Sequence, residues 1–516
     1  MSLKLMLDEA ASRYGKKTAI VSDDRRLSYA DLDEASNRVA NALIKMGVNK
    51  GDRVAMLLSN SPEFVIIYFG IVKIGAVAVP LDIKYKVAEL TSLFADCQPK
   101  VLLTESPALE PLIPVLSQFK SIRHVIDLNP GANGAFPGYR EIIAAGSARQ
   151  IETALEPEDV AYIAYTSGPS FDPRGVMLSH QSLLREATIS GDGFQQTDKD
   201  VVMLFALPMH HVVGLVMVML TAISNGSTVV MLPGVSIPTL TETIEREKVT
   251  IFMGVPFVFA LMVRSAEDDG IRHNLSSLRL CASGGAALPV ALAKRFKQLY
   301  GLDIAQFWGL TEAACHVTCQ SVDGSGEPGS VGKALPGWQL KIVDDSGNEL
   351  SPGQAGEVII RGPIMKGYYN NPQATAEVIK NGWFYTGDIG RVDGEGNLFI
   401  TGRKKDMIIV KGQNIYPGDI ESVLSTHPKV AEAAVMAFPD AMRGEVVGVV
   451  VSLKEGAVAT EPEIRRFCLE RIANYKVPKQ VISLKSLPRT TTGQIDKESI
   501  RVQLSIPSLF QEIAVS

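Results

Sequence analysis

The sequence has no apolar stretch long enough to cross a membrane. Its longest apolar run extends from Val212 to Ile223 and is interrupted by Gly214 and Thr221, whereas a membrane-spanning helix needs about 20 apolar residues. We therefore predict no transmembrane segment and interpret this run as part of a buried core. Contact with a membrane surface through an apolar patch stays open.

The first residues also lack the features of an export signal. Lys4, Asp8 and Glu9 place charges where a signal peptide would carry its apolar stretch. We expect no export signal.

Cysteine is scarce, since the 516 residues include only five. An odd number scattered through a long chain is typical of reduced thiols in a cytoplasm and argues against a disulfide framework. Cys315, His316 and Cys319 are close in sequence, but a zinc site needs a further pair of ligands at suitable spacing. We therefore favour core cysteines over a zinc site and expect a cytoplasmic protein.

Positive charge is not in excess, because the formal net charge is -5. This argues against nucleic acid as the main partner, since binding a phosphate backbone needs clustered positive charge. Hydrophobic residues make up 46% and charged residues 21% of the chain, as in ordinary globular proteins. At roughly 100–200 residues per domain, the length predicts about two to four domains.

The first part of the chain alternates helix and strand patterns. Ser28 is a suitable helix N-cap, and apolar residues follow it at helical spacing from Leu32 to Met46. The apolar run Arg53–Leu58 then has the pattern of a buried strand. This alternation favours parallel sheets covered by helices on both faces, and so an α/β fold class.

The composition changes near residue 322. Residues 321–363 are rich in glycine and proline, with short strand patterns at 340–343 and 357–360. We predict a β-rich subdomain over about residues 322–402, at the end of an N-terminal domain that covers residues 1–402.

A basic cluster at residues 403–405 precedes a compact C-terminal stretch. This stretch has strand patterns at 433–438 and 446–453 and a helix pattern starting near Pro417. We predict a second domain over residues 403–516, with a hinge at residues 403–406.

The segment from Tyr165 to Val176 carries the strongest local signal for ligand binding. A strand-like run leads into a loop of small and hydroxyl residues that contains Gly168, Arg174 and Gly175. Such a loop can direct backbone N–H groups, hydroxyls and a positive charge at phosphate oxygens. On these residues alone, a polar turn between two strands is the alternative.

Further motifs follow in an order that is known from one superfamily. They are Gln306–Glu312, Tyr385–Gly390, Gly402–Arg403, Gly412–Pro417 and Leu487–Lys497. With the loop at residues 165–176, they resemble the adenylate-forming (ANL) superfamily of acyl- and aryl-CoA synthetases, firefly luciferase and peptide-synthetase adenylation domains. The resemblance begins at Leu27–Tyr29 and covers nearly the whole chain. Within the superfamily, the chain is most similar to the acyl-CoA synthetases, or fatty-acid–CoA ligases.

The resemblance implies a fold and a reaction. The fold is a large N-terminal domain of αβα-layered sheets with a β-rich subdomain, followed by a small mobile α+β domain. The reaction uses ATP, Mg²⁺ and coenzyme A: a carboxylate attacks the α-phosphorus of ATP, and a thiol then displaces AMP from the acyl-adenylate. The catalytic task is to neutralise phosphate charge and exclude water.

The resemblance also assigns nucleotide-binding residues position by position. Glu312 matches the magnesium-associated glutamate, Thr311 the hydroxyl at the α-phosphate, Asp388 the ribose aspartate, and Arg403 the arginine near ribose and phosphate. The remaining positions lie in the phosphate loop, in the adenine-side loop and at the aromatic position beside adenine: Thr166, Ser167, Gly168, Ser170, Arg174, Gly175, Gly284, Gly285, Ala286, Ala287, Phe307, Trp308 and Gly309.

The acid pocket and the thiol tunnel follow from the same resemblance. His211 matches a histidine that shapes the carboxylate site, although His210 replaces a usual aromatic, so either histidine could face the pocket. Lys405 matches the hinge, and Lys411 and Gly412 match the turn that opens the pantetheine tunnel. Apolar or small residues complete the predicted pocket: Val212, Val213, Val255, Gly284 and Gly309.

Two departures from the family pattern concern phosphate handling. In the loop, Pro169 removes an N–H donor, Phe171 replaces a glycine, and Arg174 replaces a lysine. The family's adenylation lysine is Gln494 here, and a neutral amide cannot offset developing charge. Lys497 is the nearest cation that could take over this catalytic role.

Three functions stay open from the sequence, and the first is favoured. It is a fatty- or aryl-acid–CoA ligase with a weakened adenylation step. The second hands the acyl group to a carrier-protein thiol, and the third is a catalytically impaired protein that binds nucleotide or acyl-CoA. The sequence does not define the oligomeric state, and a homodimer stays open.

Overall fold

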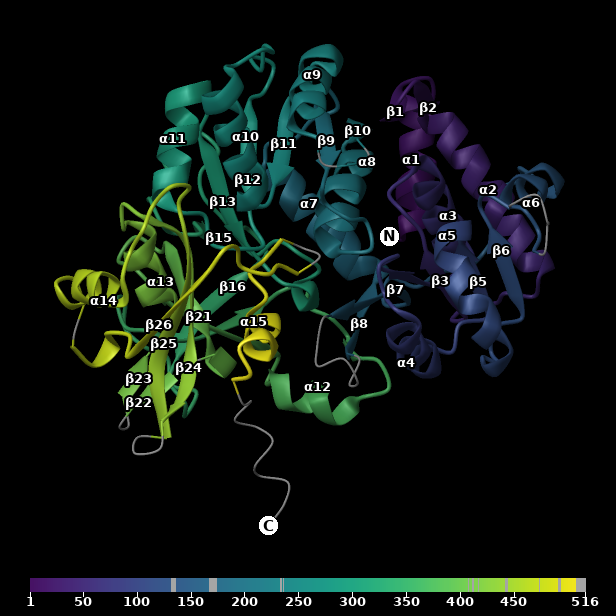
Figure 1. Ribbon diagram of the computed structural model, residues 1–516. Coiled ribbons are helices and arrows are strands. Elements are labelled where there is room, and N and C mark those ends of the chain that lie inside the picture. The colour runs from purple at the N-terminus through teal and green to yellow at the C-terminus, as the bar shows by residue number, and fades with distance from the viewer. Residues whose placement is uncertain are drawn as a thin grey trace.

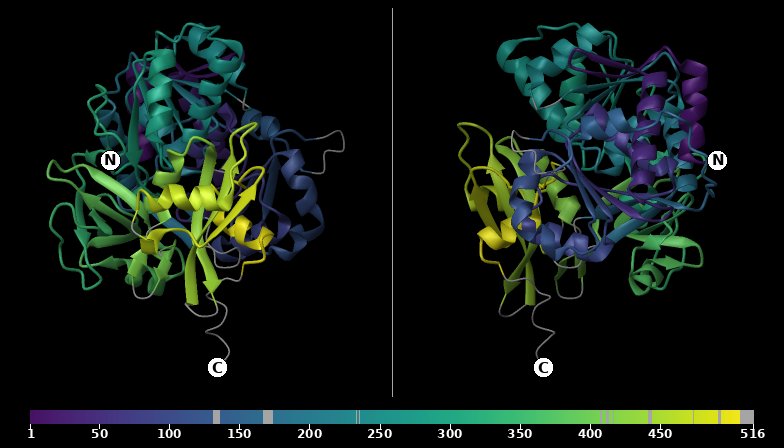
Figure 2. Two further views of the ribbon diagram at one scale, coloured as in Figure 1. Left: turned by 60° about the vertical axis from the view of Figure 1, so that its left-hand side comes forward. Right: turned by 90° about the vertical axis from the view of Figure 1, so that its right-hand side faces the viewer.

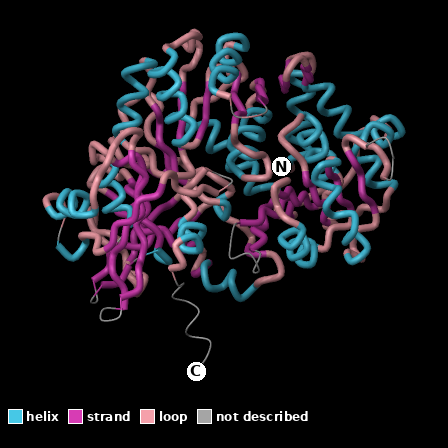
Figure 3. Tube along the Cα trace, viewed as in Figure 1, coloured by secondary structure: helices cyan, strands magenta, loops and turns pink. Residues whose placement is uncertain are grey.

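The protein is described by a computed structural model over residues 1–130, 136–166, 174–232, 234, 236–406, 408–410, 413–415, 417–440, 444–472, 474–490 and 493–506. These residues form the mixed α/β fold expected from the sequence, with a large N-terminal part and a smaller C-terminal part (Figures 1 and 3). The α/β fold class is therefore confirmed.

Two large sheets form the centre of the N-terminal part. In the described residues they have nine and seven strands, and most neighbouring strands within each sheet are parallel. The first sheet runs in space through β15 (Lys333–Ala334), β14 (Thr318–Cys319), β13 (Ile304–Trp308), β12 (Leu280–Ser283), β11 (Ile251–Gly254), β9 (Val201–Phe205), β10 (Thr228–Leu232), β1 (Thr18–Ser22) and β2 (Arg25–Ser28). The second runs through β18 (Gly367–Tyr368), β8 (Arg174–Ser179), β7 (Val160–Thr166), β4 (Val77–Leu81), β3 (Arg53–Leu57), β5 (Val101–Thr104) and β6 (His124–Asp127).

Strand residues alternate between separate cores. Along β3, Val54 and Met56 belong to a central core shared by both sheets, while Ala55 and Leu57 belong to an outer core on the other face. This alternation follows from the period of two in a strand. Both faces are buried, which explains why the strands are continuous apolar runs in the sequence.

Helices cover the sheet faces and separate the two sheets (Figures 1 and 2). Ser28 begins one of them, and its hydroxyl and Asp31 form a capping box, as its sequence position predicts. The helices of this part are α1 (Leu3–Tyr14), α2 (Tyr29–Lys45), α3 (Pro62–Lys73), α4 (Val87–Cys97), α5 (Ser106–Leu109), η1 (Glu110–Gln118), α6 (Tyr139–Ala145), α7 (His180–Gly193), η2 (Val213–Leu220), α8 (Thr221–Ser224), α9 (Ile237–Glu247), α10 (Pro256–Asp269), α11 (Val290–Tyr300) and η3 (Thr311–Ala313).

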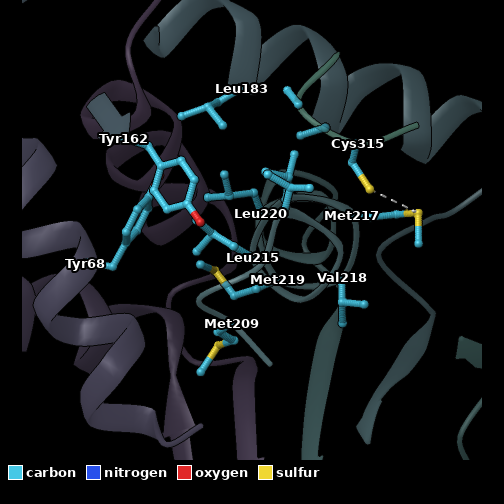
Figure 4. Packing of buried hydrophobic residues seen from close by; sticks show 14 of the residues in the cluster. Tyr68, Tyr162, Leu183, Met209, Leu215, Met217, Val218, Met219, Leu220 and Cys315 are labelled. Atoms are coloured by element: carbon cyan, nitrogen blue, oxygen red, sulfur yellow. Dashed lines mark hydrogen bonds between the residues drawn. The ribbon is translucent and has the colours of Figure 1, made fainter. Parts of the chain in front are cut away.

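The long apolar run lies in the central core, as predicted. Val213–Leu220 forms a π-helix whose side chains, except that of the partly buried Val213, have lost nearly all contact with solvent (Figure 4). Among the described residues, no helix has the length and apolarity to cross a membrane.

The predicted β-rich subdomain is an antiparallel sheet. Ile342 and Val358 of this sheet join the central core, so it packs onto the large sheets instead of forming a separate body. Its elements are β16 (Gln339–Val343), β17 (Gly356–Arg361), β20 (Trp383–Val392), β19 (Ile379–Lys380) and β21 (Leu398–Arg403), with α12 (Pro372–Val378) beside them.

The C-terminal part has hydrophobic clusters of its own. Within the described residues, these clusters run from Ile408 to Ile506, and the predicted boundary at 402–406 precedes the first of them. Its elements are η4 (Lys404–Asp406), β22 (Ile408–Val410), β23 (Gln413–Ile415), α13 (Pro417–Ser425), β24 (Val430–Asp440), β25 (Gly444–Leu453), α14 (Glu461–Leu469), η5 (Asn474–Lys476), β26 (Gln480–Leu484) and α15 (Lys497–Gln503).

Candidate active site

Four parallel strands of the nine-stranded sheet end beside one another. They are β13, β12, β11 and β9, neighbours in that order, and the carboxyl ends of parallel strands lie along one edge of a sheet. The residues that directly follow these strands are Gly309, Gly284, Val255 and Ala206. The fold thus gathers at one edge the segments that the sequence predicts for adenine and acid.

The adenine-side loop has an open backbone. A Cβ atom on Gly284 would lie 2.2 Å from the Phe307 ring, so a larger residue would displace that ring. Gly285 has a φ of +78°, which favours glycine. Gly285, Ala286 and Ala287 are exposed, so their backbone is accessible to a flat base.

Trp308, Asp388 and Arg403 form one connected group. The indole Nε1 of Trp308 donates to Asp388 Oδ2 over 3.0 Å, and Arg403 Nε lies 3.0 Å from Asp388 Oδ1. Asp388 is 4% exposed, whereas the Arg403 side chain is 55% exposed. Asp388 therefore fixes both neighbours while the guanidinium reaches solvent.

Thr311 and Glu312 begin the short helix η3. Burial raises the pKa of Glu312, although Tyr368 and the positive charge of Arg403 oppose this shift. The Tyr368 hydroxyl donates to Glu312 Oε1 over 2.9 Å. A carboxylate in this setting would be stabilised by a cation.

Tyr368 also joins Glu312 to the phosphate loop. The guanidinium carbon of Arg174 lies 5.5 Å from the centroid of the Tyr368 ring. Sequence reasoning does not find Tyr368, because its partner Glu312 is 56 residues away along the chain. The only local signal is a Gly-Tyr-Tyr run at residues 367–369, which by itself is typical of a strand end.

The described part of the phosphate loop is its two flanking strands. Thr166 of β7 pairs with Arg174 of β8, and Tyr165 pairs with Gly175. A Cβ on Gly175 would lie 2.9 Å from Ile163. The predicted phosphate-binding residues between them, Ser167, Gly168 and Ser170, lie outside the described residues.

Gln494 brings the C-terminal part to the adenine-side loop. Its Nε2 donates to the carbonyl oxygen of Gly285. The neighbouring Gly493, with a φ of +83°, faces Val255, and the guanidinium of Arg489 lies 4.7 Å from the centroid of the Phe257 ring. Residues from both parts of the chain therefore meet at this edge.

Lys497 makes its contacts elsewhere in the C-terminal part. Its Nζ donates to the carbonyl oxygen of Val435 over 3.0 Å and lies 2.8 Å from Glu421 Oε1. Gln494, and not Lys497, thus contacts the adenine-side loop in this conformation.

The two histidines of the predicted acid pocket have different partners. His211 Nδ1 accepts the Val213 N–H over 3.4 Å, and burial lowers the pKa of His211 to about 4. His210 Nε2 lies 3.6 Å from Asp82 Oδ2, and burial lowers the pKa of His210 although Asp82 opposes the shift. Both rings are partly buried, as are Val213 and Val255, while Val212 is fully buried.

The predicted hinge is described only by its backbone and its neighbours. Lys405 lies in the short helix η4, and Lys411 and Gly412 lie outside the described residues. The adjacent Lys404 Nζ lies 3.0 Å from Glu357 Oε2 and 3.1 Å from Asp345 Oδ1. These ion pairs join the start of the predicted hinge to the β-rich subdomain.

A groove of about 670 Å³ lies elsewhere, between α7 and the β-rich subdomain. Arg185, Ile189, Gln339 and Arg361 are among the residues that line it. None of the predicted site residues does, so this groove is separate from the strand-end edge.

Comparison with known proteins gives a family for most of the chain. Residues 7–369 match the family described as AMP-binding enzyme, and residues 419–494 match the AMP-binding enzyme C-terminal domain. Two curated relatives are CoA ligases. An indoleacetate–CoA ligase from Aromatoleum aromaticum is 36% identical over 99% of this chain and 100% of its own length. A long-chain-fatty-acid–CoA ligase from Bacillus subtilis is 33% identical over 96% of this chain and 93% of its own.

A solved structure resembles the whole chain. ATP-bound MatB from Rhodopseudomonas palustris superposes with a TM-score of 0.90 at 30% identity, covering 98% of this chain and 99% of MatB. Apo MatB, with the same coverage and 29% identity, gives a TM-score of 0.80. The chain therefore resembles the ATP-bound form of that protein more closely than its apo form.

Proposed function

The chain belongs to the AMP-binding enzyme family, and from this premise we propose that it is an AMP-forming ligase that joins a carboxylic acid to coenzyme A. One observation carries the proposal: the Trp308–Asp388–Arg403 group, the Thr311–Glu312 pair and Gln494 come from separate segments and converge on the carboxyl edge of one sheet. This convergence is what a nucleotide and an acid need to meet in one water-poor place.

The nucleoside side has residues suited to adenosine. Trp308 offers a flat ring for adenine beside the open backbone of Gly285. Asp388 can accept hydrogen bonds from two vicinal ribose hydroxyls, and Arg403 can interact with ribose and phosphate. Because Asp388 already holds Trp308 and Arg403, this side is preorganised for the nucleotide.

The phosphate side fits magnesium. Glu312 is a partly buried carboxylate whose raised pKa shows that a nearby cation would stabilise its charged form, and Mg²⁺ prefers such oxygen ligands together with nucleotide phosphates. When bound, Mg²⁺ would neutralise charge on the phosphate oxygens. Thr311 would then hydrogen-bond to the α-phosphate, and Arg174 would supply positive charge from the phosphate loop.

The acid is proposed to lie near His211. That segment, with Val212, Val213, Val255, Gly284 and Gly309, offers an apolar and sterically small wall. The two curated relatives act on indoleacetate and on long-chain fatty acids, as their names state. These facts support an aryl or a fatty acid as the substrate of this chain.

The two half-reactions are proposed to use two positions of the C-terminal part. In the present one, Gln494 contacts Gly285, and the closer similarity to ATP-bound MatB supports an adenylating arrangement. Rotation at Lys405 would then bring Lys411 and Gly412 to the site for thioester formation. The mobility, the hinge and the tunnel residues are part of this proposal.

Adenylation is proposed to be the weaker half-reaction. Gln494 hydrogen-bonds through an amide, so it cannot offset the charge that develops as pyrophosphate leaves. Lys497 would first have to leave Glu421 and Val435 to help. The thiol acceptor is proposed to be free coenzyme A, with a carrier-protein thiol as the alternative acceptor.

Pyrophosphate exchange across a panel of aryl and fatty acids tests the activity. We expect exchange with at least one acid, and conversion of the matching synthetic acyl-adenylate to a thioester when coenzyme A is added. No exchange with any acid and no thioester from any acyl-adenylate would overturn the ligase and leave a nucleotide-binding protein. If a thioester forms only when a carrier protein is added, the thiol acceptor is the carrier protein and not free coenzyme A.

We also propose a cytoplasmic location and leave a homodimer to a direct measurement. All five cysteines are buried and free, as a reducing compartment permits. Light scattering on the purified chain would give the oligomeric state.

A further inference from the structure

The turn that carries Thr311 and Glu312 is held in an unusual backbone conformation. Ala314 has a φ of 56° and Cys315 a φ of 150°, both in a region that side chains rarely adopt. Such conformations are unfavourable for residues with a side chain and persist only where their surroundings hold them. The turn is also closed tightly, because a Cβ on Gly309 would lie 1.4 Å from the Cys315 carbonyl oxygen.

Glu186 of helix α7 holds the far end of this turn. Its Oε1 accepts the backbone N–H of His316 over 2.6 Å. Ser190, one helical turn later, donates to the same oxygen over 3.3 Å and lies 3.2 Å from His316 Nδ1. Glu186, Ser190 and His316 are all completely buried, so water does not compete for these contacts.

The His316 ring continues this contact toward the adenine-side loop. It stacks on Phe194 at a centroid distance of 4.8 Å and an angle of 19°, and it meets the edge of Phe307 at 5.4 Å. Phe307 is the ring against which Gly284 packs. His316 therefore contacts two features at once. Its ring meets Phe307, against which the adenine-side loop packs, and its backbone lies at the end of the turn that carries Thr311 and Glu312.

The other side of the turn packs on the central apolar helix. The Cys315 side chain points toward Met217 of η2, with its Sγ 4.0 Å from Met217 Sδ (Figure 4). Because this contact is apolar and sulfur is a weak hydrogen-bonding partner, it fills space without fixing the direction of the backbone. Backbone hydrogen bonds from Met365 N–H to Glu312 O and from Val317 N–H to Trp308 O close the turn, and Glu186 accepts the N–H of His316 at its end.

The buried carboxyl is costly for the fold. Burial raises the pKa of Glu186, although the His316 N–H and the Trp338 and Ser190 side chains oppose the shift, and burial lowers the pKa of His316 to about 3. Within the described residues, Glu186 Oε2, His316 Nε2 and Trp338 Nε1 have no hydrogen bond of good geometry. An apolar side chain at position 186 would avoid this cost but would leave the His316 N–H without an acceptor.

From these contacts we infer that Glu186 is a positioning residue, which fixes the Gly309–His316 turn so that Thr311 and Glu312 face the metal-bound nucleotide. The inference rests on the proposed function for the identity of the ligand. Glu186 acts through the backbone of His316 and through Phe307, and it does not touch the nucleotide itself.

The test compares Glu186→Leu with Glu186→Gln. Glutamine keeps an acceptor oxygen of the same reach, so we expect its dissociation constant for Mg·ATP, measured by calorimetry without acid, to stay within about 2-fold of the wild type. Leucine removes the acceptor and should raise that constant by about 10-fold, while the KM for the acid in pyrophosphate exchange changes by less than about 2-fold.

A matched control separates positioning from general loss of stability. Asn37→Leu removes a buried polar side chain that binds Lys73 Nζ over 2.7 Å, among helices α1 to α3. We expect Asn37→Leu to lower the Tm and leave the affinity for Mg·ATP unchanged. An equal loss of affinity in Asn37→Leu, or wild-type affinity in Glu186→Leu, would overturn the inference.

Two further outcomes stay informative. If Glu186→Leu does not fold, Ser190→Ala can be used instead, because it removes only the hydroxyl between Glu186 and His316. An affinity for Mg·ATP weakened by about 3-fold in Ser190→Ala would support the inference, and an unchanged affinity would overturn it. If the wild type binds Mg·ATP but shows no pyrophosphate exchange with any acid, the ligase proposal fails while the calorimetric comparison still decides the role of Glu186.

Discussion

The nucleoside side of the site and its phosphate side differ in how far they keep the pattern of the adenylate-forming superfamily. On the nucleoside side, Asp388, Trp308 and Arg403 match that pattern and are joined to one another by short contacts. On the phosphate side, the loop carries Pro169 and Phe171, and Gln494 stands where the pattern has a lysine. On the proposed function, this difference leads us to expect that nucleotide recognition is kept, while Gln494 leaves less positive charge near the reacting atoms.

The largest effect is expected on the nucleoside side, from Asp388→Ala. The substitution removes the ribose acceptor and leaves a buried indole N–H and an arginine without their common partner, so kcat/KM for ATP should fall on the order of 1000-fold. Steady-state pyrophosphate exchange measures this loss. Asp393→Asn, in the turn after the same strand, is the control and should change little. A fall of less than about 3-fold in Asp388→Ala would remove Asp388 from the nucleotide site.

On the phosphate side, Gln494→Lys should produce a gain. Restoring a positive charge should speed pyrophosphate exchange by roughly 100-fold, because a lost charge contact of this kind typically costs a few kcal/mol.

The same variant should convert synthetic acyl-adenylate to thioester at the wild-type rate, since that step does not need the charge. Gln494→Ala, which loses the contact with Gly285 without adding charge, is the control. If Gln494→Lys exchanges no faster than the wild type, another residue already supplies the charge.

A smaller effect is expected where the two sides meet, at Tyr368. Tyr368→Phe removes the hydroxyl that donates a hydrogen bond to Glu312 Oε1. The KM for Mg·ATP should therefore rise by about 10-fold. Titrating Mg²⁺ at fixed ATP would show the same shift. The adjacent Tyr369→Phe should behave like the wild type, and equal effects in both variants would contradict a specific role for Tyr368.

The smallest effect concerns stability away from the site. Burial lowers the pKa of His180 to about 4, from 6.5 for the exposed group. Between these values the unfolded chain binds a proton that the folded chain does not, so stability should fall as pH decreases from 6.5 to 4.

Thermal unfolding at several pH values between 7.5 and 5 would reveal this slope. His180→Gln should have a shallower slope than the wild type, because the unfolded chain no longer gains that proton. Identical slopes would show that other groups dominate the acid sensitivity.

Much of the fold and part of the site can be predicted from the sequence, for a physical reason. Strand patterns such as Arg53–Leu58 and the cap at Ser28 depend on residues that are neighbours in the chain, and both are found in the structure. The motif residues Asp388 and Trp308 could be named from their surroundings in the sequence. Their hydrogen bond could not, because it joins positions 80 residues apart.

The contacts that depend on packing between distant elements could not be predicted. Tyr368 and Glu186 carry no motif of their own, and the short cysteine–histidine pattern around His316 pointed to a different chemistry, so the proposed roles of all three follow only from what they meet in the fold. For the same reason the sequence could name Lys497 as a substitute cation but could not show its pairing with Glu421. The residue types at the proposed site can be read from the sequence, whereas the partners of these residues are known only from the structure.

Transfer of an oxygen isotope from the acid to the nucleotide would show whether the acid becomes an acyl-adenylate. The wild-type chain would be incubated with ATP, Mg²⁺, coenzyme A and an accepted acid labelled with ¹⁸O in its carboxylate, and the nucleotide product would be analysed by mass spectrometry. The carboxylate oxygen that attacks phosphorus leaves with AMP, so we expect AMP that carries a single ¹⁸O atom. Unlabelled AMP, or ADP as the product, would contradict this expectation.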